Sequence, residues 1–106
     1  MAFKSLFLAY TPDADKEKHR SVIETGKYKL FSVVVKNLAE ALEVIRDFVK
    51  KEGINSILLC PGFTHSDIAE IVKVTEHKVA VSVARGDGPS GKISQEVMKR
   101  EGFLSK

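Results

Sequence analysis

Four short apolar runs, rich in β-branched residues, constrain the fold of this chain more than any other feature. They occupy Phe3–Tyr10, Tyr28–Val35, Ser56–Cys60 and Val79–Ala84. Such runs are typical of strands covered on both faces, and the stretches between them carry helical periodicity. Alternating strands and helices predict a parallel sheet with right-handed crossovers, so we expect an α/β protein.

Four helices are predicted around these strands. The clearest covers residues 38–51, where apolar residues form one stripe, with Asn37 as N-cap and Gly53 as the stop. The other three are expected over residues 16–25, 66–76 and 93–101. In the last of these, Ile93 and Val97 are expected to face the core.

We expect the strand order 2-1-3-4 in a four-stranded parallel sheet. The two middle helices would cover one face and the first and last helices the other, which gives a small flavodoxin-like three-layer sandwich. In such sheets the ligand crevice opens at the carboxyl ends of the strands, where the winding direction reverses. The loops at residues 10–15, 60–66 and 85–92 would line it.

Composition limits the classes of protein that fit. The 106 residues suit one domain, spanning 1–106, and 43% apolar residues with a net charge of +3 exclude disorder. One cysteine excludes an intrachain disulfide and, without a signal-peptide pattern, predicts a cytoplasmic protein. Basic residues are scattered and no apolar run approaches the roughly 20 residues of a membrane span, so we expect neither nucleic acid nor membrane as a partner.

The loop after the third apolar run carries the most informative residues. A thiol at Cys60, just before a helix N-terminus, lies in positive potential that favours the reactive thiolate. His65 is near enough in sequence to act as base or acid, so the two residues are a candidate Cys/His pair. Alternatively, Cys60 is a small buried hydrophobe. Gly62 is expected to need backbone angles that glycine allows and to turn amides toward an anion.

The loop after the first run adds Tyr10, Asp13 and His19. Asp13 is a candidate site carboxylate, although a side-chain oxygen there also suits a helix cap. His19 falls in the first turns of the helix predicted over residues 16–25. From there it either leans over the crevice or lies in solvent.

The loop after the fourth run adds Arg85 and Asp87. Arg85 can bind a carboxylate or phosphate bidentately, or pair with Asp87. Residues 86–92 match seven positions of the phosphate-binding pattern G-x-x-x-x-G-K-[ST], but Ile93 stands where a hydroxyl is required. The stretch is therefore an anion nest or a simple turn. The three histidines show no metal-ligand spacing, so no metal and no cofactor is predicted.

Three segments resemble a family of short uncharacterised bacterial and archaeal proteins. They are residues 14–25, 59–65 and 81–85, and the resemblance covers nearly the whole chain. The family is known as a domain of unknown function, so the resemblance implies no activity.

Two functional hypotheses follow. In the first, the domain binds a small anionic ligand at the carboxyl edge of the sheet, and Cys60, His65 and His19 would carry any chemistry. Its ligand-binding residues would be Tyr10, Asp13, Gly62, Arg85 and Asp87. In the second, the chain is a non-catalytic binding or regulatory module that forms homo-oligomers, since open sheet edges invite pairing.

Overall fold

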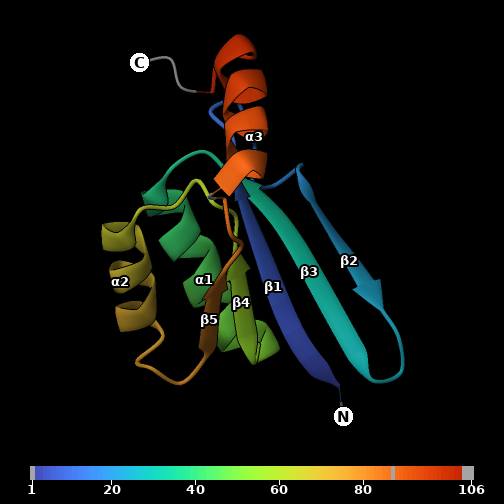
Figure 1. The fold of residues 1–106 in the computed structure, drawn as a ribbon. Coiled ribbons are helices and arrows are strands. Elements are labelled where there is room, and N and C mark those ends of the chain that lie inside the picture. The colour runs from blue at the N-terminus through green and yellow to red at the C-terminus, as the bar shows by residue number, and fades with distance from the viewer. Residues whose placement is uncertain (1, 87, 104–106) are drawn as a thin grey trace.

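The computed structural model describes residues 2–86 and 88–103, which form one five-stranded sheet and three helices (Figure 1). The strands are β1 (Phe3–Tyr10), β2 (Arg20–Glu24), β3 (Tyr28–Val35), β4 (Ser56–Leu59) and β5 (Ala80–Val83). The helices are α1 (Leu38–Glu52), α2 (His65–Val74) and α3 (Gly88–Arg100). The expected α/β class is confirmed.

The sheet has the order β2-β3-β1-β4-β5 and is mostly parallel. The four predicted strands lie side by side in the expected relative order. The predicted four-stranded, all-parallel sheet is wrong in detail, because β2 adds a fifth strand that runs antiparallel to β3.

The helix predicted over residues 16–25 is wrong, because its second half is β2. Val22 and Ile23 pair there with Phe31 and Leu30 of β3. The hydroxyl of Thr25 closes the hairpin by accepting the backbone N–H groups of residues 27 and 28, at 3.2 and 3.0 Å. Paired β-branched residues beside a tight turn therefore override the helical pattern of the charged residues before them.

The core lies on one face of the sheet, beneath α1 and α2. It consists of strand residues that alternate toward the helices and the helix residues that meet them, chiefly Leu6, Leu8, Val33, Ile57, Leu59, Ala41, Ile45 and Ile71. The predicted caps of α1 are confirmed: Asn37 Oδ1 accepts the backbone N–H of Glu40 at 2.8 Å, and Gly53 follows the helix with φ 64°. This glycine is needed because positive φ strains other residues.

The expected three-layer arrangement is not formed, because α3 does not return to the sheet. It stands beyond the carboxyl ends of the strands and does not cover the sheet face opposite α1 and α2 (Figure 1). The side chains that were expected to face the core are instead 66% exposed at Ile93 and 42% exposed at Val97. The described chain is therefore a two-layer structure with a projecting helix.

Candidate functional site

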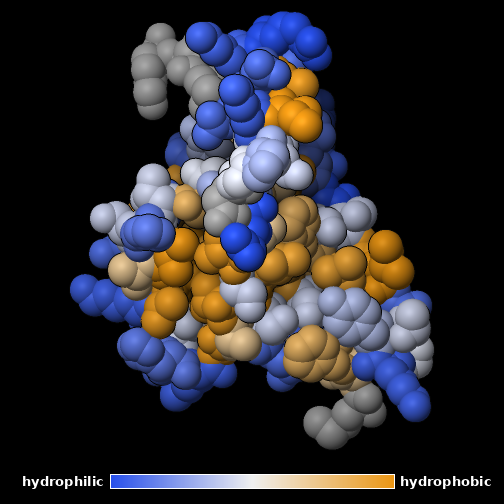
Figure 2. All heavy atoms as spheres, viewed as in Figure 1, coloured by the Kyte–Doolittle hydropathy of each residue, from blue (hydrophilic) through white to orange (hydrophobic). Residues whose placement is uncertain are grey.

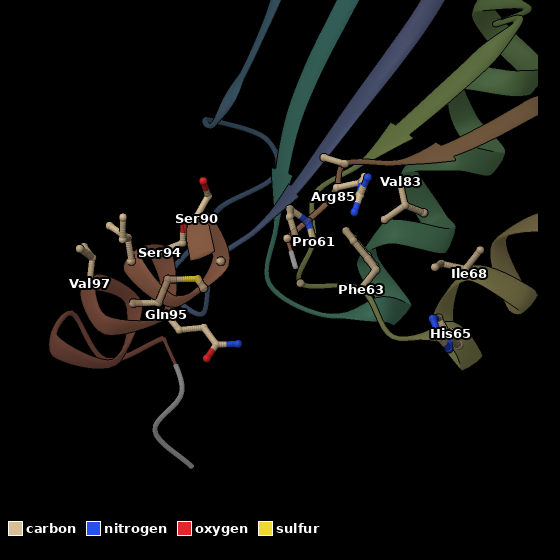
Figure 3. A pocket seen from close by; sticks show the side chains of 16 residues that line it. Pro61, Phe63, His65, Ile68, Val83, Arg85, Ser90, Ser94, Gln95 and Val97 are labelled. Carbon is tan, nitrogen blue, oxygen red and sulfur yellow. The ribbon is translucent and has the colours of Figure 1, made fainter. Parts of the chain in front are cut away.

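A cavity of about 890 Å³ lies at the carboxyl edge of the sheet, between α3 and the segments that follow β4 and β5. Its lining is Pro61, Gly62, Phe63, His65, Ile68, Val83, Ala84, Arg85, Gly86, Ser90, Gly91, Ile93, Ser94, Gln95, Val97 and Met98. Figure 3 shows the labelled residues of α3 on one side of this space and those of the α2 and β5 ends on the other.

One wall of the cavity is the turn between β4 and α2. Thr64 caps α2: its hydroxyl accepts the N–H of Asp67 at 3.1 Å, and the Asp67 carboxylate accepts the N–H of Thr64 at 3.0 Å. This capping box fixes the first turn of α2 and so places the exposed His65 at the cavity rim. Phe63 is buried directly before the cap and joins the core to the cavity.

A second wall is the segment after β5. The backbone N–H of Ala84 donates to Leu59 O at 2.8 Å, which continues the strand pairing one residue past β5. Arg85 follows at once and borders the cavity with an exposed side chain. Its guanidinium is a planar fork, the geometry that suits a carboxylate or phosphate.

The third wall is α3, held close to the segment before it by glycines. A Cβ on Gly91 would collide with the carbonyl oxygen of Gly86, and a Cβ on Gly86 would lie 2.6 Å from Cβ of Pro61. Both contacts require residues without side chains. They bring the start of α3 against the turn after β4 and set the width of the cavity.

The charge of the lining is one-sided. Among the described residues that border the cavity, none is acidic, whereas Arg85 is cationic. Most of the remaining lining is aliphatic or aromatic, with Ser90, Ser94 and Gln95 as neutral polar groups. The site can therefore hold an apolar body beside a negatively charged group.

The predicted Cys60/His65 pair is not brought together. Cys60 packs partly buried against the core, and its backbone N–H donates to Leu8 O at 3.0 Å. The described lining of the cavity includes His65 but not Cys60, and within the described chain no hydrogen bond links the two side chains. The position of Cys60 is therefore that of a packed hydrophobic side chain, the alternative to a reactive thiol.

Tyr10 and Gly62 lie beside Cys60. A Cβ built on Gly62 would be 3.6 Å from Cys60 Sγ and 3.8 Å from Cβ of Tyr10, which are ordinary contact distances. Gly62 is not among the described residues with positive φ, so the expectation of special backbone angles there is wrong. Gly62 borders the cavity, whereas Tyr10 does not.

Asp13 and His19 hold turns in the segment before β2. Asp13 Oδ1 accepts the hydroxyl of Thr11 at 2.7 Å, and His19 Nδ1 accepts the backbone N–H of Asp15 at 2.9 Å. His19 precedes β2 and does not lie on a helix. Three strand spacings, about 14 Å, separate β2 from β4, so His19 is remote from Cys60.

Asp15 also stabilises this segment. The backbone N–H of Glu17, which donates to Asp15 Oδ1 at 3.0 Å, holds the pKa of this exposed carboxyl below its ordinary value. Burial opposes the shift, while Lys18 and His19 support it. Asp15 therefore acts as a turn-forming group.

The glycine-rich segment of residues 86–92 is mostly helical, because α3 begins at Gly88. Lys92 is exposed on that helix and does not border the cavity. The predicted binding residue Asp87 lies outside the described residues.

Several residues of the cavity were not among the predicted site residues: Phe63, Ile68, Val83 and the side chains of α3. The apolar members of this set had only their apolar character as a sequence signal, which also fits a core position. The spacing of Ile93 and Val97 gave the helix and its apolar side, but not the surface that this side meets.

No three His, Cys, Asp or Glu side chains of residues 2–86 and 88–103 are arranged to hold a metal ion. Among the helices described, none is long and apolar enough to cross a membrane. The fold and the cavity define a two-layer α/β protein with a ligand-sized hollow at its carboxyl edge.

The chain belongs to the family described as a family of unknown function, DUF6506, whose model matches residues 3–99. No curated protein and no solved structure matches it. Membership confirms the resemblance to an uncharacterised domain and assigns no activity.

Proposed function

We propose that the protein binds a small organic acid with an apolar body in the cavity at the carboxyl edge. The observation that carries this proposal is the placement of Arg85 at the border of a largely apolar cavity whose described lining has no acidic side chain. The guanidinium would bind the carboxylate or phosphate of the ligand, and Phe63, Ile68 and Val83 would contact its apolar part.

The size of the cavity supports a small-molecule ligand. Its volume of about 890 Å³ is near the upper end of the range for ligand pockets, roughly 300–1,000 Å³. Apolar walls with a few polar groups are the usual composition of such pockets. Burial of each ligand methylene would contribute about 0.8 kcal/mol, so affinity should rise with the length of the apolar part.

The arrangement supports binding without a chemical step. A cysteine nucleophile needs a base within hydrogen-bond reach, about 3 Å, and an open approach for the substrate. Cys60 is partly buried outside the cavity and has no hydrogen bond to His65. We therefore place His65 at the cavity rim as a second group that faces the ligand.

The proposal is tested by thermal unfolding with octanoate and with octanamide, its uncharged analogue. We expect octanoate to raise the melting temperature in a concentration-dependent way, because a ligand that binds only the folded state stabilises it. Octanamide should have a much smaller effect. Arg85→Gln should remove most of the difference between the two compounds.

Lys92→Gln is the matched control, since it removes a positive charge from the neighbouring helix without touching the cavity. It should leave the octanoate effect unchanged. Equal stabilisation by acid and amide, or equal losses in the Arg85 and Lys92 variants, would contradict the proposed role of the guanidinium.

A further inference from the structure

The sheet face opposite α1 and α2 contains no charged residue within the five strands. Strand register and alternation place fourteen residues on it: Phe3, Ser5, Phe7, Ala9, Ser21, Ile23, Tyr28, Leu30, Ser32, Val34, Ser56, Leu58, Ala80 and Ser82. Charged residues make up 29% of the chain, so a solvent-facing surface of this size would ordinarily carry several. The face has the composition of a buried one.

Apolar side chains on this face are exposed to solvent. Ile23 is 61% exposed, Phe3 52% and Leu58 40%. Figure 2, seen from the side drawn in Figure 1, shows apolar side chains gathered over the strands. The strands of four to eight residues, at about 3.3 Å per residue and 4.8 Å between strands, give a face of about 450 Å². This is the size of the largest apolar patches on monomers, which often mark interaction sites.

Helix α3 carries a second uncovered apolar surface, formed by Ile93 and Val97 one turn apart. In the structure, the helix does not lie on its own sheet (Figure 1). The close contacts of Gly91 with the Gly86 carbonyl, and of Gly86 with Pro61, hold its first turn beside the turn after β4. The described part of each chain therefore has two exposed apolar surfaces, one on the sheet and one on α3, which do not contact each other.

We propose that a second copy of this chain covers the open sheet face, with each copy placing α3 on the sheet of the other. Thirteen helical residues span about 20 Å, which matches the roughly 20 Å width of the five strands. A two-fold axis makes the exchange reciprocal and leaves no copy unpaired. The serine and alanine positions of the face provide room for a helix.

The area available is enough for a dimer. A helix about 20 Å long and 10–12 Å wide covers about 240 Å² of the sheet. The two reciprocal contacts hide this area on four surfaces, roughly 1,000 Å² in all, which is the least expected of a biological interface. The proposal does not rest on the ligand proposed above. Because Ile93 and Val97 also border the cavity, the partner sheet would cover the open side of the cavity.

Oligomeric state measured by light scattering tests the interface. Val22 and Ile23 are adjacent on β2, similarly exposed, and point to opposite faces of the sheet. We expect the unaltered protein and Val22→Glu to be dimers. Ile23→Glu and Leu58→Glu should be folded monomers, with dissociation constants raised at least about 100-fold because each substitution occurs twice in the interface.

A monomeric unaltered protein, or a dimer that both face variants retain, would overturn the proposal. Circular dichroism shows whether each variant is folded. If one of the two face variants fails to fold, the other still tests the interface. Disulfide trapping then tests the helix exchange, in a Cys60→Ala background. Mixed chains that carry Ile93→Cys and Leu58→Cys separately should form a covalent dimer under oxidation. If the mixed chains did not cross-link, while a single chain carrying both cysteines formed an internal bond, the exchange would be overturned.

Discussion

The close contact of Gly91 at the base of α3 predicts the sign of the stability change in Gly91→Ala. Helix propensity alone would raise the free energy of unfolding, whereas a clash with Gly86 would lower it. In an unconstrained helix, Gly91→Ala would stabilise the protein by about 1 kcal/mol, since alanine has the higher helix propensity. Here the new Cβ would meet the carbonyl oxygen of Gly86, and Gly86 is itself blocked by Pro61. Overpacking of this kind costs about 1–3 kcal/mol, so we expect a net loss of about 1 kcal/mol.

Urea denaturation followed by circular dichroism measures this change in the free energy of unfolding. Ser94→Ala on the same helix is the control, because it gains helix propensity without a contact to Gly86, and it should stabilise by a few tenths of a kcal/mol. If Gly91→Ala also stabilised the protein, the close approach of α3 to the preceding segment would be refuted.

Three further variants test local parts of the account. Thr64→Ala should lower the free energy of unfolding by about 1 kcal/mol through loss of the α2 cap, and Thr64→Ser should restore it. Cys60→Ala should cost about 1 kcal/mol of packing and leave the octanoate-induced thermal shift intact; loss of that shift would place the thiol in the site. The carboxylate of Asp15 has a lowered pKa because it binds the Glu17 N–H, so its stabilising effect is full above its ordinary pKa and is lost as the pH falls through the lowered value. Asp15→Asn should therefore be less stable than the parent at neutral pH, and urea titrations should converge in acid; an unchanged difference there would contradict this role.

The sequence was sufficient to predict the parallel part of the sheet and the helices over it. Asn37 and Gly53 mark the ends of α1, and the apolar stripe between them shows which side meets the sheet. These signals are local, because capping and periodicity depend on residues within a few turns. They predict an element reliably when tertiary contacts agree with them.

The segment before β3 could not be predicted in the same way, because two local signals conflict there. The charged residues from Lys16 to Arg20 favour a helix, whereas Val22 and Ile23 before the Thr25-Gly26 turn favour a strand. Pairing with β3 decides between them. This pairing depends on residues beyond the segment itself.

The candidate site was predicted in part. Gly62, His65 and Arg85 follow predicted strands, and the shared direction of parallel strands brings them to one edge. Cys60 lies outside the cavity because it directly follows β4 and packs, partly buried, against the core. The α3 wall could not be predicted, since amphipathic spacing gives an apolar side without naming the surface that covers it.

Binding at the cavity is tested most directly by following the backbone amides in an NMR titration with octanoate. The account predicts that the largest shifts occur at Phe63, at Arg85 and along the first turns of α3, with saturation at a common dissociation constant. A smaller hollow of about 350 Å³ lies elsewhere, between β2 and α1, and is bordered by Arg20 and Phe48. Largest shifts at those two residues, or across the open sheet face, would contradict the assignment of the site.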